Sequence, residues 1–351
     1  MTMSASTRVM ADDIAEIIGR DLPWEKLTGT TVLVTGASGM LPSYAVRTLL
    51  RLNDEHQAGI TVLGLVRNEE KAHRALSDVV ERTDFRLIVQ DVSAPLDLEG
   101  PLDLIIHGAS AARPSLHSAD PIGTMKANLL GTMNLLDLAA RTGSTFSLMS
   151  SAEVYGSQAA DVELIGENSY GGFDILNPRS CYSEGKRAAE TLCSAYAAQH
   201  GITCRIARFG HIYGPGMALD DGRVQAEFTA KVLAGEDIVL NSDGSAQRTY
   251  TYVGDAIAGL FFILLTGEEM VYNISDVDGL TSIRGLAEAF TTVRPELGLQ
   301  VHTKPSDTGS RYAAAKAQGL DSARLLALGW RPLVDLSSGL ARTVRSHADE
   351  A

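Results

Sequence analysis

The stretch that decides the fold is TVLVTGASGMLP, residues 31–42, together with the helical pattern that continues from it to residue 52. The run TVLVT predicts a strand over 31–35 that is buried on both faces, because it lacks the alternation of a half-exposed strand. In the turn after this strand, Gly36 allows a sharp change of direction. Gly39 allows the backbone to approach a pyrophosphate seated on the helix N-terminus. A GxxG turn alone is also typical of ordinary strand–helix connections, but this order of elements favours a dinucleotide-binding unit.

The same alternation of apolar runs and helical patterns continues through the first two-thirds of the chain. Further buried strands are predicted over 60–66, 85–89, 103–107, 145–150 and 203–208, with helical stretches such as 121–141 and 180–200 between them. This rhythm predicts an α/β fold with a Rossmann-type, doubly wound parallel sheet and right-handed crossovers. We expect a Rossmann domain over 29–210 with 251–275 returning to its sheet, a smaller mixed α/β substrate-binding portion formed by 211–250 and 276–345, and an N-terminal helical extension over 1–28.

Composition excludes several classes of function. The 351 residues carry a formal net charge of −13, which argues against a nucleic-acid partner because such proteins need a basic face. No apolar run approaches the ~20 residues that a membrane span needs, so no membrane partner is expected. The odd set Cys181, Cys193 and Cys204 has no CxxC spacing and no nearby His pair, which predicts reduced thiols and no metal site. We therefore expect a cytoplasmic protein.

The choice of cofactor depends on the residue at the end of the second strand. An acidic residue there would bind the adenosine ribose of NAD, but Arg67 comes directly after Val66. The arginine is compatible with the 2′-phosphate of NADP, and equally with a solvated surface position. Asp91, just after the third strand, could bind the adenine amine or cap a turn. The predicted cofactor contacts are Gly36, Ser38, Gly39, Met40, Arg67, Asp91, Val92, Ala109, Tyr182 and Lys186.

A catalytic pair is predicted on the helix over 180–200. Tyr182 and Lys186 stand at i and i+4, on one helix face, where an ammonium group lowers the pKa of a neighbouring phenol. The phenol could then exchange a proton with a substrate hydroxyl while nicotinamide exchanges a hydride. Ser151, at the end of an apolar strand, could bond the same substrate oxygen, and Asn128 is a further polar candidate for the substrate site. The alternative for the pair is a half-buried tyrosine beside a surface lysine.

Several ordered motifs resemble the extended short-chain dehydrogenase/reductases that act as nucleotide-sugar epimerases, dehydratases and decarboxylases. The resemblance extends over about 29–343, and it implies a tightly held NAD that is reduced and reoxidised within one turnover through a keto-sugar. Such internal recycling needs no 2′-phosphate site, so NAD is favoured despite Arg67, with NADP left open. The motifs are TGASGMLP (35–42), HGAS (107–110), NLLGTMNLL (128–136), SSAEVYG (150–156), YSEGK (182–186), YGPGM (213–217) and GWRP (329–332).

The tripeptide Ser151-Ala152-Glu153 bears on the reaction. By resemblance, dehydratases usually carry Thr-Asp-Glu there, UDP-glucuronate decarboxylases Thr-Ser-Glu, and simple 4-epimerases no Glu. The absence of Asp at 152 disfavours dehydration, and Glu153 would act as acid or base near the reacting carbons. Its alternative role is that of a structural partner of a backbone N–H.

The segments 177–192, 214–224 and 244–255 are similar to the UDP-glucuronate decarboxylase branch. That similarity places Arg248 at the diphosphate or reacting end of the substrate and Arg223 near the nucleotide. His211 stands where an asparagine often binds diphosphate, and it is either a substrate contact or structural. Ala152 and Gly216 also depart from the pattern of this branch.

The resemblance leaves the reaction open among related possibilities. Decarboxylation ranks first, 4-epimerisation second and dehydration third, with a nucleoside or another nucleotide as a possible substrate. A non-catalytic NAD-binding sensor is the alternative from another class. The family commonly forms homodimers through helix pairs that correspond to 121–141 and 180–200 here.

Overall fold

The computed structural model describes residues 4–159, 162–304 and 319–348. Its centre is a seven-stranded sheet of order β11-β7-β5-β4-β1-β2-β3 in which every neighbouring pair is parallel. This arrangement confirms the expected Rossmann-type fold, and the six strands expected from the sequence lie within one residue of their predicted bounds. The strands are β1 (Thr31–Thr35), β2 (Thr61–Val66), β3 (Phe85–Val89), β4 (Leu104–His107), β5 (Thr145–Ser151), β7 (Cys204–Phe209) and β11 (Val271–Ile274).

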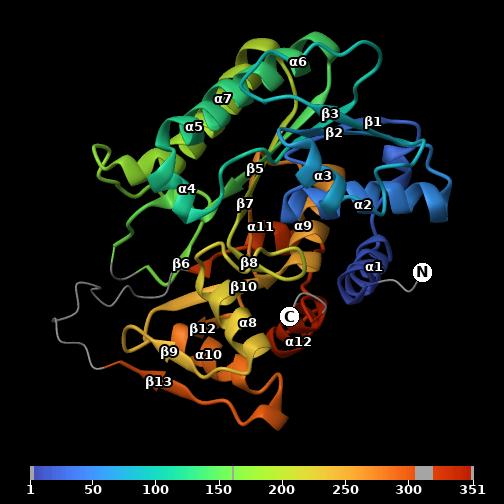
Figure 1. The fold of residues 1–351 in the computed structure, drawn as a ribbon. Helices are drawn as coiled ribbons and strands as arrows, with labels where there is room; N and C mark the ends of the chain where they lie inside the picture. The colour runs from blue at the N-terminus through green and yellow to red at the C-terminus, as the bar shows by residue number, and fades with distance from the viewer. Residues whose placement is uncertain (1–3, 160–161, 305–318, 349–351) are drawn as a thin grey trace.

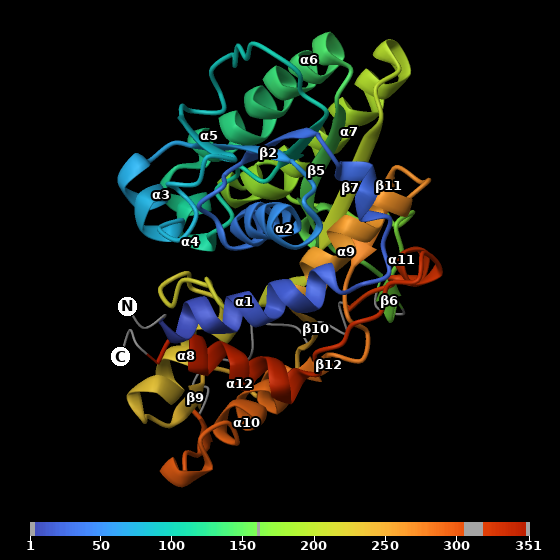
Figure 2. The same ribbon diagram turned by 90° about the vertical axis from the view of Figure 1, so that its right-hand side faces the viewer.

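Helices cover both faces of this sheet (Figures 1 and 2). Alternate residues of β1 serve the two faces: Val32 and Val34 pack into one hydrophobic cluster and Leu33 into the other. The continuous apolar run is thereby explained. One face carries α2 (Met40–His56), α3 (Glu69–Ala75) and α9 (Val253–Thr266), and the other carries α5 (Pro121–Lys126), η2 (Ala127–Gly131), α6 (Thr132–Thr142) and α7 (Cys181–His200).

One predicted helix is interrupted. The stretch 121–141 forms α5 and α6 with a π-helical turn, η2, between them. Periodicity predicted one continuous helix because a π-turn inserts a single residue without breaking the apolar pattern.

A smaller portion lies beside the main sheet, at the bottom of Figure 1. Its three-stranded sheet has β8 parallel and β12 antiparallel to the central β10, and β9 pairs with β13. The strands are β8 (His211–Tyr213), β9 (Ile238–Leu240), β10 (Gln247–Tyr252), β12 (Leu280–Ser282) and β13 (Val301–Thr303), and the helices are α8 (Val224–Ala234), α10 (Ile283–Thr291) and α12 (Leu336–Ser346). Shorter elements are η1 (Trp24–Leu27), α4 (Pro114–Ala119), η3 (Ala152–Tyr155), β6 (Leu164–Ile165), η4 (Pro178–Ser180), η5 (Pro295–Leu297), β14 (Gly319–Leu320) and α11 (Ala323–Ala327).

The N-terminal helix α1 (Ala5–Ile18) lies between α2 and α12 (Figure 2) and so touches both portions. Its buried Asp13 accepts hydrogen bonds from Tyr44 Oη at 2.7 Å, Tyr252 Oη at 2.8 Å and an Arg342 nitrogen at 2.9 Å. One carboxylate therefore ties α1 to α2, β10 and α12. Within the described ranges, no helix is both long enough and apolar enough to cross a membrane.

Candidate active site

The N-terminal turns of α7 carry the predicted catalytic pair against the end of β5. Tyr182 and Lys186 are both buried, one helical turn apart. Lys186 Nζ donates a hydrogen bond to the Met149 carbonyl of β5 at 2.8 Å, which fixes the ammonium group beside the sheet. Burial lowers the pKa of Lys186 to about 8, and the charge of Glu190 opposes that shift. The side chain is thus cationic at neutral pH but close to titration.

Tyr182 and Ser151 are brought together, as the motifs predict. Burial raises the pKa of Tyr182, and a hydrogen bond with Ser151 acts in the opposite direction. The nearby charges that act on the phenol are those of Glu153, which raises its pKa, and Arg223, which lowers it. Among the described groups, Lys186 is not one of those that shift the pKa of Tyr182, so the lowering expected from its ammonium group is not observed.

Glu153 comes two residues after Ser151, in the short helix η3, and its side chain is exposed. Its carboxylate Oε2 accepts a hydrogen bond from Ser183 Oγ at 3.2 Å, and its backbone N–H donates to Ser151 Oγ at 3.2 Å. The carboxylate therefore lies over the first turn of α7, beside the Ser151–Tyr182 pair. Ser183 is a site neighbour that sequence reasoning missed.

The turn between β1 and α2 has the geometry of a dinucleotide cradle. Gly36 has a φ of +68°, and a Cβ there would stand 2.9 Å from Cα of Ala109. Gly39 caps the 17-residue helix α2 without a side chain, so the first-turn amides, near Ser38 and Met40, face an anion site. These residues fit the pyrophosphate of NAD.

The residues after β2 and β3 are those predicted to contact the adenosine part of the cofactor. Arg67, with a side chain 78% exposed, lies 3.9 Å from the carboxylate of Asp91. Asp91 also accepts a hydrogen bond from the Ser93 backbone, which is the turn-capping alternative to binding adenine, and Val92 is buried against Gly131. Arg67 and Asp91 thus form a long, solvent-exposed ion pair at this edge.

Two residues that were predicted to bind substrate, His211 and Arg248, lie on two paired strands of the smaller portion. His211 of β8 is the register partner of Tyr250 of β10, and their ring centroids are 5.8 Å apart. Arg248 lies two residues before Tyr250 and so projects from the same face of the strand. Burial lowers the pKa of His211 to about 4, and the charges of Arg248 and Arg223 add to that effect. His211 is therefore neutral at pH 7.

The polar groups on this face have few partners inside the chain. Across the described residues, the buried hydroxyl of Tyr250 has no hydrogen-bond partner. Arg248 bonds the carbonyl of the adjacent Gln247, and burial lowers its pKa while Tyr250 and Glu153 act against that shift. Arg223 forms an ion pair with Asp221 at 2.9 Å, but its buried Nε also has no hydrogen-bond partner among the described residues. Sequence reasoning missed Tyr250, although its i+2 spacing from Arg248 was a usable signal.

Asn128, which was predicted to bind substrate, forms two hydrogen bonds within the chain. It lies buried in the π-turn, where its Oδ1 accepts from Ser110 Oγ and its Nδ2 donates to the Thr124 carbonyl, both at 3.0 Å. Gly185 of α7 packs directly on it. These contacts hold the π-turn against α7, and the contact of Asn128 with substrate stays a prediction.

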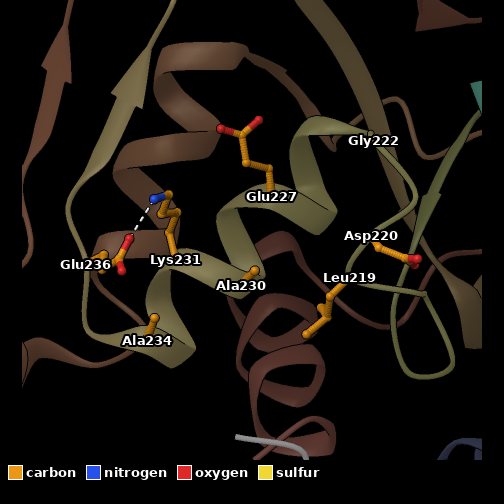
Figure 3. A pocket seen from close by; sticks show the side chains of 8 residues that line it. All are labelled: Leu219, Asp220, Gly222, Glu227, Ala230, Lys231, Ala234 and Glu236. Carbon is orange, nitrogen blue, oxygen red and sulfur yellow. Dashed lines mark hydrogen bonds and ion pairs between the residues drawn. The ribbon is translucent and has the colours of Figure 1, made fainter. Parts of the chain in front are cut away.

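A separate hollow of about 430 Å³ lies on the outer side of α8 (Figure 3). The ion pair between Lys231 and Glu236, 2.6 Å long, is part of its wall. None of the predicted catalytic residues is among those that line it, so the chemistry is placed at the β5–α7 site instead. The lining residues are Leu219, Asp220, Gly222, Glu227, Ala230, Lys231, Ala234 and Glu236.

Comparisons with known proteins agree with this geometry. Residues 32–275 match the model of the NAD dependent epimerase/dehydratase family. UDP-glucuronic acid decarboxylase 6 of Arabidopsis thaliana is 33% identical over 311 residues, 88% of this chain and 86% of that protein. UDP-glucuronic acid decarboxylase 1 of Danio rerio is 33% identical over 319 residues, covering 91% and 73% of the two chains. The dTDP-glucose 4,6-dehydratase of Streptomyces venezuelae, solved with NAD and TYD bound, superposes with a TM-score of 0.75 at 25% identity, covering 91% and 97%.

Proposed function

Because the chain belongs to the NAD dependent epimerase/dehydratase family, we propose that it is a UDP-glucuronate decarboxylase. The observation that carries this proposal is the position of Glu153, whose carboxylate lies beside the Ser151–Tyr182 pair and within electrostatic reach of Arg248. The names of the two relatives that are 33% identical support the same substrate.

The cradle formed by Gly36, Gly39 and the N-terminus of α2 would hold the pyrophosphate of NAD. When bound, NAD supplies the acceptor and later the donor of a hydride. Internal recycling of that hydride means that no second cofactor is consumed.

Residues of α7 and β5 would transfer the protons in the two redox steps. Tyr182 would receive the proton of the sugar hydroxyl that is oxidised, and would return it when the ketone is reduced. Ser151 would bond the same oxygen and hold it against the phenol. The cationic Lys186, fixed by the Met149 carbonyl, stabilises the phenolate while the tyrosine is deprotonated.

Loss of carbon dioxide is a consequence of the position of the carboxylate on the sugar. Once the hydroxyl at C4 of glucuronate has become a ketone, the C6 carboxylate is that of a β-keto acid. Its C5–C6 bond breaks, carbon dioxide leaves, and the electron pair forms an enolate at the C4 oxygen. Glu153 or a water that it orders would deliver the proton that C5 needs. Arg248 and the neutral His211 would hold the anionic oxygens of the substrate.

The test is mass spectrometry of the products from UDP-glucuronate, with no cofactor added to the purified protein. We expect a UDP-sugar that has lost one carbon dioxide. A product of unchanged mass that separates from the substrate on chromatography would indicate an epimerase, and a product lighter by one water a dehydratase. Recovery of unchanged substrate from this and other nucleotide sugars would indicate a non-catalytic NAD-binding protein.

We further propose that the protein is a cytoplasmic homodimer. Apolar side chains on the segment 121–141 are exposed: Ile122 at 68%, Leu130 at 40% and Met133 at 38%. They lie on the face where the family commonly pairs this segment and α7 with a second copy. The three cysteines are free thiols, which fits a reducing compartment. Light scattering would give the mass, and Ile122→Glu should yield monomers.

A further inference from the structure

A histidine that the sequence did not single out lies on the ring of the catalytic tyrosine. The imidazole of His117, in α4, is stacked on Tyr182 with ring centroids 4.6 Å apart and an interplanar angle of 11°. The two residues are far apart in sequence, since α4 belongs to the segment after β4 and Tyr182 to α7. The contact therefore encloses one face of the phenol.

Two hydrogen bonds hold His117 in this orientation. Its Nε2 lies 2.8 Å from the carbonyl oxygen of Ala111, and because a carbonyl only accepts, Nε2 carries the proton. The backbone carbonyl of His117 accepts from the thiol of Cys181, the residue before Tyr182, at 3.6 Å. Ring and backbone are thus each anchored, one to the loop after β4 and one to the start of α7.

The charge state of His117 is suited to this contact. Burial lowers the pKa of His117, and the charges of Arg179 and Arg223 lower it further. The hydrogen bond to Ala111 and the charge of Glu153 act in the opposite direction. The ring is therefore neutral at neutral pH, and it covers Tyr182 without adding a further cation beside Arg223.

We propose that His117 is a positioning residue for the reaction, whose stacked ring fixes the direction in which the Tyr182 phenol points. A tyrosine side chain turns about two bonds, and an open face would let the phenol leave the line to Ser151. The stacked ring and its two hydrogen bonds therefore restrict the Tyr182 phenol to the orientation in which it points toward Ser151 and Glu153. This inference rests on the proposed function for its kinetic test but not for its structural one.

The kinetic test compares two substitutions at one position. His117→Ala removes the stack, and we expect kcat to fall by roughly ten- to a hundred-fold with KM nearly unchanged, because a misdirected proton acceptor slows chemistry and not binding. His117→Phe restores a stacked ring without the bond to Ala111, and should recover most of kcat. Leu116→Ala, an exposed neighbour on α4, is the control for general loosening of that helix and should behave as wild type.

A second measurement needs no turnover. Nitration of Tyr182 by tetranitromethane, with peptide mass spectrometry as the readout and the exposed Tyr170 as the internal standard, reports access to the ring. We expect several-fold faster nitration of Tyr182 in His117→Ala, and the wild-type rate in His117→Phe and Leu116→Ala. Wild-type kcat and nitration in His117→Ala, or equal losses in the Phe and Ala variants, would overturn the proposal. If wild type converts no nucleotide sugar, the proposed function fails while nitration still decides the stacking role.

Discussion

Two polar clusters in this molecule are bonded in opposite ways. At the seam between the two portions, Asp13 accepts from two phenols and a guanidinium, and Arg342 also binds Glu16 at 2.8 Å. At the site, the Tyr250 hydroxyl has no partner within the described chain, and Arg248 reaches only the carbonyl next to it. Both clusters are largely buried, so burial alone does not distinguish them.

The difference lies in how completely the polar groups are satisfied. Folded proteins pair nearly all their buried polar atoms, and each exception needs an explanation. The seam is saturated, as expected of a network that holds elements together. In the site, the buried hydroxyl of Tyr250 lacks a partner in the described chain, so a ligand that reached it would supply a missing hydrogen bond. Substitutions in the seam should therefore change stability, and substitutions in the site should change turnover.

The largest effect is expected at Tyr182. Tyr182→Phe removes the proton acceptor but keeps the ring and its stacking, so turnover should fall by about 10³- to 10⁴-fold. The free energy of unfolding should change little, because the bond lost is the one with Ser151. Single-turnover kinetics and denaturant unfolding would measure the two effects. A variant that kept its turnover would remove Tyr182 from the mechanism.

A substitution in the seam should have the opposite effect, a loss of stability with little change in activity. Asp13→Ala leaves the buried hydroxyls of Tyr44 and Tyr252 without their acceptor and removes one of the two carboxylates that bind Arg342, so the free energy of unfolding should fall by about 3–5 kcal/mol. The fraction that remains folded should keep its kcat. Asp12→Ala, an exposed neighbour on α1, is the control and should change stability by less than about 0.5 kcal/mol. Unchanged unfolding in Asp13→Ala would mean that the network does not hold the seam.

Glu153 sharpens the comparison within the site. Glu153→Gln keeps the shape and the contact with Ser183 but removes the charge. Oxidation should proceed while the later proton transfer slows by about a hundred-fold, so a keto-sugar and reduced cofactor should accumulate. Absorbance at ~340 nm, the band of reduced nicotinamide, and mass spectrometry would detect them. If the variant matched wild type, Glu153 would be structural.

Lys186 belongs to the site but affects stability as well. Its pKa in the folded protein is about 8, below its ordinary value of 10.5. Below pH 8 the ammonium is charged in both states, and its burial disfavours folding. Between about 8 and 10.5 the unfolded chain binds more protons, so this group makes stability rise with pH.

Lys186→Met removes that buried charge. The variant should be more stable than wild type at pH 7 by on the order of 1–3 kcal/mol, with the difference shrinking toward pH 10, and it should be inactive. Denaturant unfolding of both proteins at the two pH values would measure this, with the exposed Lys71→Met as control. If the stability difference did not depend on pH, the pKa of Lys186 would not be lowered in the folded protein.

The sequence was sufficient to predict those parts of the fold and the site that depend on contiguous residues. The run from Thr31 to Pro42 specified a buried strand, a positive-φ glycine and a helix, because local sterics decide each of them. The sequence did not predict contacts between side chains from elements that are distant in the chain. His117 reaches Tyr182 only because α4 folds over α7, and no local pattern encodes that stacking. The sequence also did not show that the Asn128 amide bonds Ser110 and the Thr124 carbonyl, because hydrogen bonds between side chains and backbone depend on the fold.

The smallest expected effect is the most discriminating for the comparison. Tyr250→Phe deletes one hydroxyl that has no partner in the described chain, while the ring stays packed beside His211. In the seam, the same change at Tyr44 breaks a bond to Asp13 and should cost about 1–2 kcal/mol of stability.

At Tyr250 the free energy of unfolding should stay the same or rise by up to ~1 kcal/mol, because burying an unpaired hydroxyl opposes folding. If the hydroxyl binds a substrate oxygen, KM should rise by about three- to ten-fold. Unfolding curves and steady-state kinetics of the two Tyr→Phe variants, measured side by side, separate the two roles. If Tyr250→Phe lost as much stability as Tyr44→Phe, the Tyr250 hydroxyl would have a hydrogen-bond partner in the folded protein. The site and the seam would then not differ in how completely their polar groups are bonded.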